Sequence, residues 1–277
     1  MSPDAIVRLR LDIAYDGTQF AGWAVQPGQR TVQGELHTAI ATVLRLPSVS
    51  LTVAGRTDAG VHATGQVAHL DIPAVTWEVA ARQLVRRLSG VLPSDVRVYG
   101  ATEVPAQFDA RFSALWRRYE YRICDREGGA EPLRRQQVLN WHPALDAAAM
   151  AAAARQLVGL HDFAAFCRRR DNATTIRALE RFDVQREQHE IVCTLQADAF
   201  CHSMVRSLVG AVLAVGDGRR PVGWVATKLD QPSRAEDVRV AAACGLTLTK
   251  VAYPPDDQLA ARAAQTREVR LLPPRPR

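Results

Sequence analysis

One aspartate, Asp58, lies between two glycines and close to an arginine and a histidine within residues 54–69. A free Asp has a pKa of about 3.9, so its carboxylate is ionised at neutral pH and can attack a sugar carbon or a polarised ring carbon. Gly55 and Gly60 permit the backbone angles of a tight loop. The pattern therefore predicts a loop that presents Asp58 as a nucleophile. An ion pair between Arg56 and Asp58 that braces an ordinary turn would leave the same pattern.

Other chemistry is less well supported by the residues. The chain lacks the phosphate loop G-x-x-x-x-G-K-[ST] and the nucleophile elbow G-x-S-x-G, which argues against nucleoside triphosphate use and against esterase chemistry. His62 and His69 have no third metal ligand near them in the sequence. The cysteines, which lack the close spacing of a zinc site or a redox pair, are Cys124, Cys167, Cys193, Cys201 and Cys244. We therefore expect no metal, no structural disulfide and a reducing compartment, the cytoplasm.

The composition suits a globular protein with a basic surface. The chain has 277 residues, a formal net charge of +6 and 47% hydrophobic residues. A basic surface favours a polyanion such as nucleic acid as partner, although a GC-rich genome would produce the same excess of arginine without any partner. Arginine clusters occur at residues 86–87, 117–118, 134–135, 168–170 and 219–220. Guanidinium groups spread in this way suit a phosphate backbone, and a solvated surface is the alternative for each cluster.

Local patterns predict two similar halves. Alternating apolar and polar residues predict strands, and apolar residues at helical spacing predict amphipathic helices. The expected strands cover residues 7–13, 51–54, 66–72, 96–104, 119–123, 182–184 and 191–197. The expected helices cover residues 36–44, 77–88, 146–159 and 203–215. Two successive strand-and-helix halves predict an α+β fold with helices on one face of each antiparallel sheet.

The domain organisation follows from these halves. We expect an N-terminal half over residues 1–105, a C-terminal half over residues 106–255 and a loosely ordered tail over residues 256–277. Arg8 and Arg10 interrupt the apolar stretch near the N-terminus, which argues against a signal peptide. No apolar run approaches the length that spans a membrane, so we expect no membrane partner.

Several motifs resemble those of one family, in order from about Arg8 to Tyr253. Besides the loop around Asp58 they are Tyr15-Asp16-Gly17, Gly22-Trp23, Arg30-Thr31-Val32-Gln33, Phe108 to Ala114, Arg117 to Tyr121, Phe200 to Arg206, and Gly245-Leu246. Together they resemble the tRNA pseudouridine synthase A (TruA) family. Ser203 departs from the histidine or asparagine that members often carry, which leaves local substrate contacts there open.

The resemblance implies a fold and a reaction. The fold would be two ferredoxin-like (RRM-like) halves whose sheets join into one long antiparallel sheet around a central active-site cleft. The reaction would isomerise uridine to pseudouridine at positions 38, 39 and 40 in the anticodon stem-loop of tRNA, without a cofactor. The resemblance also implies a homodimer. It leaves open whether the nucleophile attacks C1′ of the sugar or C6 of the base.

The resemblance further assigns roles to five residues. Asp58 would be the nucleophile, Tyr119 would stack on the uracil, and Arg206 would pair with Asp58. Arg56 would contact the RNA, and Leu246 would pack against the uracil ring. From the residues alone, Tyr119 would equally be a core tyrosine of a strand, and Arg206 would equally form a surface ion pair.

Three other functions are compatible with parts of the pattern. A non-catalytic RNA-binding module would use the same basic surface, but it has no need of an acid between glycines. A hydrolase with an aspartyl intermediate usually needs a second acid and Mg²⁺, which the loop does not supply. A pseudouridine synthase of the same kind with shifted target positions would carry the same motifs.

Overall fold

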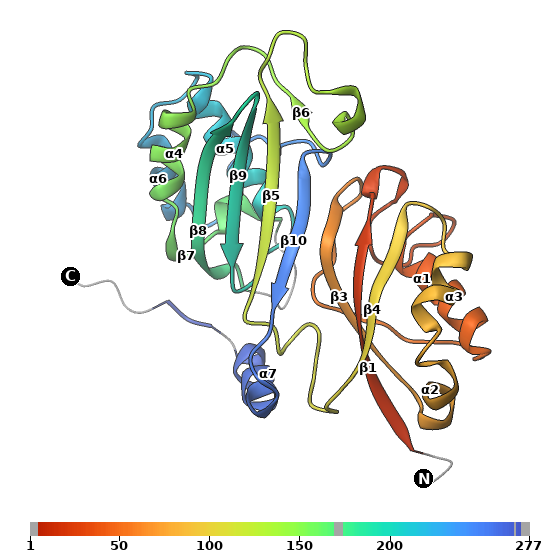
Figure 1. Ribbon diagram of the computed structural model, residues 1–277. Helices are drawn as coiled ribbons and strands as arrows, with labels where there is room; N and C mark the ends of the chain where they lie inside the picture. Colours follow the sequence, from red (N-terminus) through yellow and green to blue (C-terminus); the bar gives the residue numbers. More distant parts are fainter. Residues whose placement is uncertain (1–4, 169–173, 269, 273–277) are drawn as a thin grey trace. The chain divides into compact units, whose positions relative to one another are not determined.

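A computed structural model describes residues 5–168, 174–268 and 270–272 (Figure 1). Within those residues it has ten strands and seven α-helices, which confirms the predicted α+β class. The chain divides into two compact units, of which the first comprises Met1–Leu115 with Leu248–Arg267 and the second Trp116–Thr247 with Glu268–Arg277. The sequence placed the boundary near residue 105, whereas the chain leaves the first unit after Leu115 and returns to it at Leu248.

The first unit has the order of a ferredoxin-like fold. Its elements are β1 (Ile6–Tyr15), α1 (Val32–Leu44), β2 (Thr52–Val53), β3 (His62–Pro73), α2 (Ala74–Ala80), α3 (Leu84–Val91), β4 (Val96–Val104) and, near the C-terminus, α7 (Leu259–Arg267). The strand order is β4-β1-β3, with β2 paired to β3. The pairs β1–β3 and β1–β4 are antiparallel. Two βαβ halves interleaved in this order form the split arrangement of ferredoxin-like domains.

The expected amphipathic patterns form the core of this unit. Alternate residues of β1, namely Leu9, Leu11 and Ile13, are buried, as are Leu36 and Ile40 on one face of α1. These side chains lie at the two-residue and 3.6-residue periods that bury one face of a strand or a helix. The predicted strand at residues 7–13 and the helix that follows it are therefore confirmed.

The single helix predicted over residues 77–88 was wrong. The structure has two short helices, α2 and α3, which are separated by the exposed residues 81–83. Helix α2 follows β3 directly and packs on β3 and β1, whereas α3 packs on α1 and β4. The chain breaks because the two segments cover different surfaces, which one straight helix does not reach.

The second unit repeats the same order. Its elements are β5 (Trp116–Cys124), β6 (Leu139–Asn140), α4 (Ala147–Arg155), β7 (Gly159–Asp162), β8 (Ile176–Glu187), β9 (Glu190–Ala197), α5 (Met204–Gly216), α6 (Trp224–Thr227) and the start of β10 (Leu246–Ala252). The strand order is β10-β5-β9-β8-β7, with β6 paired to β5. The prediction of two ferredoxin-like halves is therefore confirmed. That their sheets join around a cleft stays a prediction.

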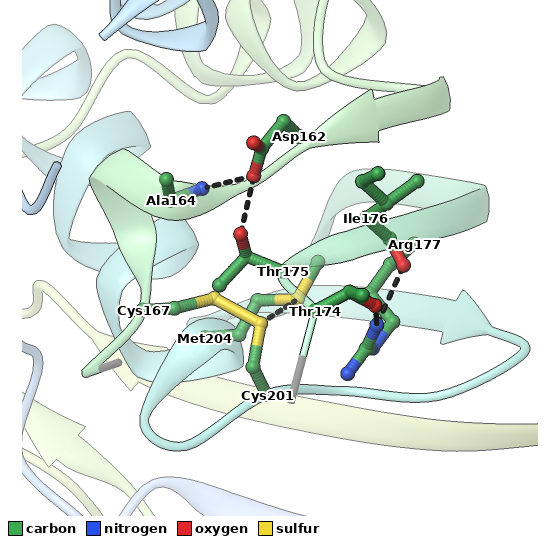
Figure 2. Close-up of a disulfide and its surroundings, with 9 residues drawn as sticks. All are labelled: Asp162, Ala164, Cys167, Thr174, Thr175, Ile176, Arg177, Cys201 and Met204. Carbon is green, nitrogen blue, oxygen red and sulfur yellow. Dashed lines mark hydrogen bonds between the residues drawn. A yellow bond between two sulfur atoms is a disulfide. The ribbon is translucent and has the colours of Figure 1, made fainter. Parts of the chain in front are cut away.

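The absence of a structural disulfide was predicted wrongly. Cys167 and Cys201 form a disulfide with a Cα–Cα distance of 5.8 Å (Figure 2). The two residues are 34 apart in sequence, so their spacing carries no sign of the bond. Cys167 follows a turn in which the N–H of Ala164 donates to Asp162 Oδ1 (3.0 Å), and Cys201 precedes α5. The bond thus ties the chain after β7 to the start of α5.

The C-terminal segment contains an ordered helix. The sequence predicts a loosely ordered tail from residue 256, but α7 buries Leu259 and Ala263 within the first unit. The apolar positions of α7 are few and alanine-rich, which is why the pattern did not predict the helix. No helix in the described part of the chain is long and apolar enough to cross a membrane.

Candidate active site

The loop between β2 and β3 carries Asp58 in the first unit. Asp58 is half-buried and Arg56 is exposed. The N–H of Val61 donates to the carbonyl of Asp58 (3.2 Å), and Gly60 has a φ of +78°, which favours glycine. Gly55, by contrast, has no positive φ, and a Cβ added there would meet nothing within 4 Å. Of the two glycines expected to shape the loop, only Gly60 is required by its backbone conformation.

Main-chain contacts hold this loop against residues 17–23. The N–H of Trp23 donates to the carbonyl of Thr57 (3.1 Å), and the N–H of Gly60 donates to the carbonyl of Phe20 (3.3 Å). Gly22 has a φ of +98°, and a Cβ there would lie 2.9 Å from the carbonyl oxygen of Thr57. The two segments therefore approach too closely for any side chain at residue 22.

A neutral hydrogen-bond network lies under the loop. The hydroxyls of Tyr15 and Thr57 are 2.7 Å apart, and Gln66 Nε2 donates to the carbonyl of Gly55 (2.9 Å) and to Tyr15 Oη (3.2 Å). Burial raises the pKa of Tyr15 to about 12, so the phenol stays protonated at neutral pH. Sequence reasoning missed Thr57 and Gln66 as supports of the loop, since both are buried polar side chains, in the loop for Thr57 and on β3 for Gln66, and burial is not visible in the sequence.

The two histidines of the loop region serve the fold. His62 Nδ1 accepts the N–H of Gly17 (3.0 Å), and His69 Nδ1 accepts the N–H of Ala110 (3.0 Å). His62 Nδ1 also lies 3.1 Å from Asp16 Oδ1. Among the described residues, no group of three or more His, Cys, Asp or Glu side chains could hold a metal ion.

Tyr119 lies on β5 in the second unit. It pairs with Leu195 of β9, and 8% of its surface is exposed. Its ring meets the edge of the Phe200 ring at a centroid distance of 5.2 Å and an angle of 90°. This geometry is typical of a favourable aromatic pair, and it fixes the plane of the phenol.

Arg206 lies in the first turns of α5. Its Nε donates to the carbonyl of Ala241 (2.7 Å), and the N–H of Ala241 donates to the carbonyl of Arg206 (3.0 Å). Gly210, one turn further, would place a Cβ 1.8 Å from the carbonyl oxygen of Arg239. The segment of residues 239–241 therefore lies directly against α5.

The same segment leads to Leu246, which is buried at the start of β10. Tyr121 Oη donates to the carbonyl of Ala242 (2.8 Å), and Gly245 leaves no room for a Cβ beside the Tyr121 ring. Residues 239–246 thus connect Arg206 with Leu246. Tyr121, which lies on β5 two residues after Tyr119, supports this segment. Their contact with Asp58 and Arg56, which belong to the first unit, stays a prediction.

The arginines of the predicted clusters make different kinds of contact. Arg117 Nη1 donates to the carbonyl of Asp198 (2.7 Å), Arg118 binds Gln196, Arg134 pairs with Glu190, and Arg219 pairs with Asp217. Arg86 and Arg87 on α3 are exposed, whereas Arg169 and Arg170 lie outside the described residues. Arginines of several clusters therefore bind other parts of the chain. The structure does not support the idea that all clusters together form one continuous binding surface for a phosphate backbone.

Comparisons with known proteins define the class. A family model described as tRNA pseudouridine synthase matches residues 13–113 and 153–254. The tRNA pseudouridine synthase A of Frankia casuarinae is 61% identical over 99% of this chain and 98% of its own length. The protein of the same name from Streptomyces griseus is 56% identical over 96% of this chain and 95% of its own length. That from Mycobacterium leprae is 54% identical over 95% of this chain and 96% of its own length. The chain is therefore an RNA-modifying isomerase.

More particularly, the chain belongs to the tRNA pseudouridine synthase family, and pseudouridylation of tRNA is its reaction. The family resemblance drawn from the motifs is confirmed. Among solved structures, a chain of an H/ACA ribonucleoprotein bound to a substrate RNA containing 2′-deoxyuridine aligns with a TM-score of 0.33 and 12% identity. That alignment covers 74% of this chain and 53% of the other.

Proposed function

We propose that this enzyme isomerises uridines 38, 39 and 40 in the anticodon stem-loop of tRNA, with Asp58 as the nucleophile and without a cofactor. One observation carries the proposal: the loop of Asp58 is braced by main-chain contacts to Trp23 and Phe20 and by the close approach of Gly22. A surface turn needs no such support. A carboxylate that must reach one carbon of a bulky substrate does, because small misplacements cost rate.

The reaction conserves every atom of the nucleotide except one exchanged proton. The N1–C1′ bond breaks, the uracil turns, and a C5–C1′ bond forms, after which C5 loses its proton and N1 gains one. No electrons are exchanged with a second substrate, so neither ATP nor a redox cofactor is required. Asp58 would bond transiently to C1′ or to C6, and either adduct resolves when the new glycosidic bond is complete.

The other residues would position the base and the RNA. Tyr119 would stack on the uracil and help to remove the C5 proton, and Leu246 would pack on the ring. Arg206 would pair with Asp58 and favour its anionic form. Arg56, which is exposed beside Asp58, would contact the RNA and occupy the space that the displaced base leaves.

Extrusion of the target uridine requires energy from elsewhere in the complex. A stacked and paired base costs a few kcal/mol to flip, and phosphate contacts can supply that energy. Recognition through the backbone of A-form RNA does not depend on base edges. One site could therefore serve three neighbouring uridines.

The decisive experiment replaces Asp58 with an amide of nearly equal size. We expect Asp58→Asn to lower the release of tritium from [5-³H]uridine in tRNA by at least about 1,000-fold, because the nucleophile is lost. The affinity for tRNA should stay within about twofold, since it depends on phosphate contacts. Asp183→Asn, on the exposed face of β8, is the matched control and should retain full activity. Turnover retained in Asp58→Asn and in Asp58→Ala would reject the assignment.

The target positions and the assembly have separate tests. Pseudouridine should be missing at positions 38, 39 and 40 of tRNA from cells that lack the protein, and its persistence there would reject the target. We also propose a homodimer in the cytoplasm, on the family resemblance and on the tRNA substrate. Sedimentation at micromolar concentration should give twice the chain mass of 30.4 kDa. A monomer at that concentration would reject the dimer.

A further inference from the structure

The C-terminal helix α7 lies outside the region that the family model matches, which ends at residue 254. It nevertheless buries Leu259 and Ala263. The helix packs on residues 105–115, which connect β4 to β5 and are called the linker below. Because a short helix frays unless it packs on something, the contacts with the linker are what holds α7 in place.

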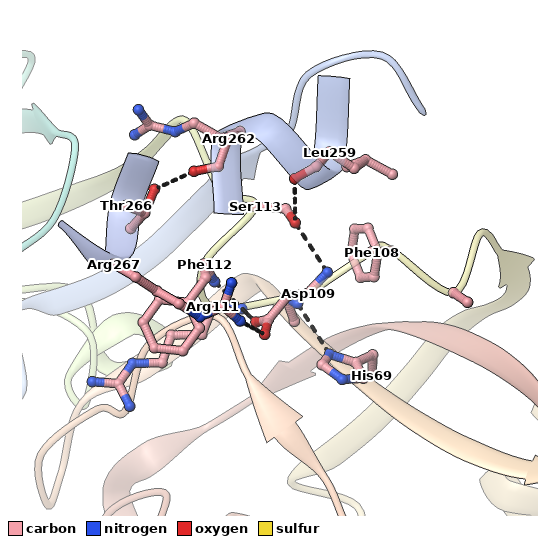
Figure 3. Close-up of polar contacts among 12 residues, drawn as sticks. His69, Phe108, Asp109, Arg111, Phe112, Ser113, Leu259, Arg262, Thr266 and Arg267 are labelled. Carbon is pink, nitrogen blue, oxygen red and sulfur yellow. Dashed lines mark hydrogen bonds and ion pairs between the residues drawn. The ribbon is translucent and has the colours of Figure 1, made fainter. Parts of the chain in front are cut away.

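Two residues of α7, Leu259 and Arg267, contact the middle of the linker (Figure 3). Ser113 Oγ donates to the carbonyl of Leu259 (3.2 Å) and accepts the N–H of Asp109 (3.0 Å). Arg267 Nη2 lies 3.1 Å from Asp109 Oδ2, and its guanidinium lies over the Phe112 ring at 4.3 Å. Helix and linker thus share both polar and apolar contacts.

Arg262 binds the end of the linker. Its Nε donates to the carbonyl of Ala114 (3.1 Å), and its Nη2 donates to the carbonyl of Leu115 (3.2 Å). Leu115 is the last residue of the first unit before β5, and its own N–H donates to the carbonyl of Ala252 (2.8 Å). A planar guanidinium can bind two adjacent carbonyls at once, which a lysine ammonium does with less precision.

The start of the linker is held by other elements. Arg8 Nη1 donates to the carbonyls of Ala106 (2.7 Å) and Phe108 (3.0 Å), and Tyr253 Oη donates to the carbonyl of Ala110 (2.7 Å). These contacts come from β1 and from the segment after β10. Of the residues of α7, Arg262 therefore acts on the part of the linker that leads into β5.

We propose that Arg262 is a positioning residue for the tRNA reaction. It fixes the carbonyls of Ala114 and Leu115 and thereby the start of β5, the strand on which Tyr119 lies. Arg262 does not touch the substrate in this role. The proposal rests on the proposed function, because Tyr119 has its role only there.

The test compares three full-length variants by tritium release and by hydrogen–deuterium exchange. We expect Arg262→Ala to lower kcat by about 10- to 100-fold, because a displaced catalytic group loses its reactive geometry. KM for tRNA should change by less than about twofold, since no RNA contact is removed. The amides of residues 114–119 should exchange faster. Arg262→Lys should give an intermediate kcat. The control Thr266→Ala removes a hydroxyl that donates to the carbonyl of Arg262 within α7 and leaves the Arg262 guanidinium in place, so it should behave as wild type.

Two results would overturn the proposal. One is a wild-type kcat in folded Arg262→Ala, whatever its loss of stability. The other is a wild-type kcat in Arg262→Lys although its residues 114–119 exchange faster than in wild type. This second result can be obtained even if Arg262→Ala does not fold. A failure of the proposed function has a different signature: Asp58→Asn would keep its turnover. In Asp58→Asn, exchange at residues 114–119 should in any case stay at the wild-type rate.

Discussion

The loop of Asp58 in the first unit and the helix of Arg206 in the second are both held by main-chain contacts, but the second adds a contact of the functional side chain itself. In the loop, Trp23 is bound to Thr57 and Gly22 is too close for a side chain. In α5, Ala241 is bound to the carbonyl of Arg206 and Gly210 is too close to Arg239 for a side chain. The guanidinium of Arg206 also donates to Ala241, so its position depends on residues 239–241. The comparison indicates that close backbone approach places both segments and that the Arg206 head group depends in addition on the segment packed against α5.

The two units also differ in the kind of interaction that stabilises them near the site. The network under the Asp58 loop, made of Tyr15, Thr57 and Gln66, is neutral. The second unit relies on a disulfide before α5 and on an ion pair between Arg186 and Asp125 at the end of β5. The neutral network should therefore respond to steric change, the disulfide to reductant and the Arg186–Asp125 pair to acid.

The largest effect should come from a methyl group in the first unit. Gly22→Ala places a Cβ 2.9 Å from the carbonyl oxygen of Thr57 at a φ of +98°. We expect the loop to move, kcat to fall by about 100-fold and the free energy of unfolding to fall by about 1–3 kcal/mol. Tritium release and urea unfolding measure the two quantities.

Gly55→Ala is the matched control in the same loop. Nothing lies within 4 Å of a Cβ at that position. Its free energy of unfolding should stay within about 0.5 kcal/mol of wild type. Equal losses of activity in the two variants would show that bracing by Gly22 has no special role.

A smaller effect is expected from reduction of the disulfide in the second unit. Breaking the Cys167–Cys201 bond releases a closed loop of the unfolded chain, so the free energy of unfolding should fall by about 2–4 kcal/mol. Urea unfolding with and without dithiothreitol measures the change. The double variant Cys167→Ser/Cys201→Ser should match the reduced protein and be insensitive to reductant. Superimposable curves for oxidised and reduced wild type would contradict the expectation.

The smallest effect concerns acid. The hydrogen bond from Arg186 lowers the pKa of Asp125 to about 2. Because the folded pKa lies below the unfolded value of about 3.9, the pair stabilises the fold above pH of about 4, and this contribution is lost as the pH falls toward 2. Arg186→Gln should raise the midpoint of acid unfolding by about 0.5 pH unit. Arg181→Gln, in an exposed pair on the same strand, should leave it unchanged.

Much of the fold could be predicted because it depends on local patterns. Three elements follow from residues within a few positions of one another. They are the alternating strand β1, the hairpin of β8 and β9, and the helix α4, which Asp146 caps. The break between α2 and α3 did not follow, since it depends on which surface each helix covers. Helix α7 was missed because its few apolar positions are mostly alanine, and because the linker residues that it packs on lie far away in the sequence.

The sequence by itself determined the chemical groups and the family: an acid between glycines, a set of ordered motifs and two strand-and-helix halves. Only the tertiary structure decided which residues brace Asp58, where Arg117 and Arg262 bind, and that Cys167 meets Cys201. The physical reason is distance along the chain. Propensity and periodicity act over a few residues, but Tyr15 and Thr57 are 42 positions apart, and Arg262 and Ala114 are 148 apart. Such pairs exist only once the packing of the whole unit has brought them together.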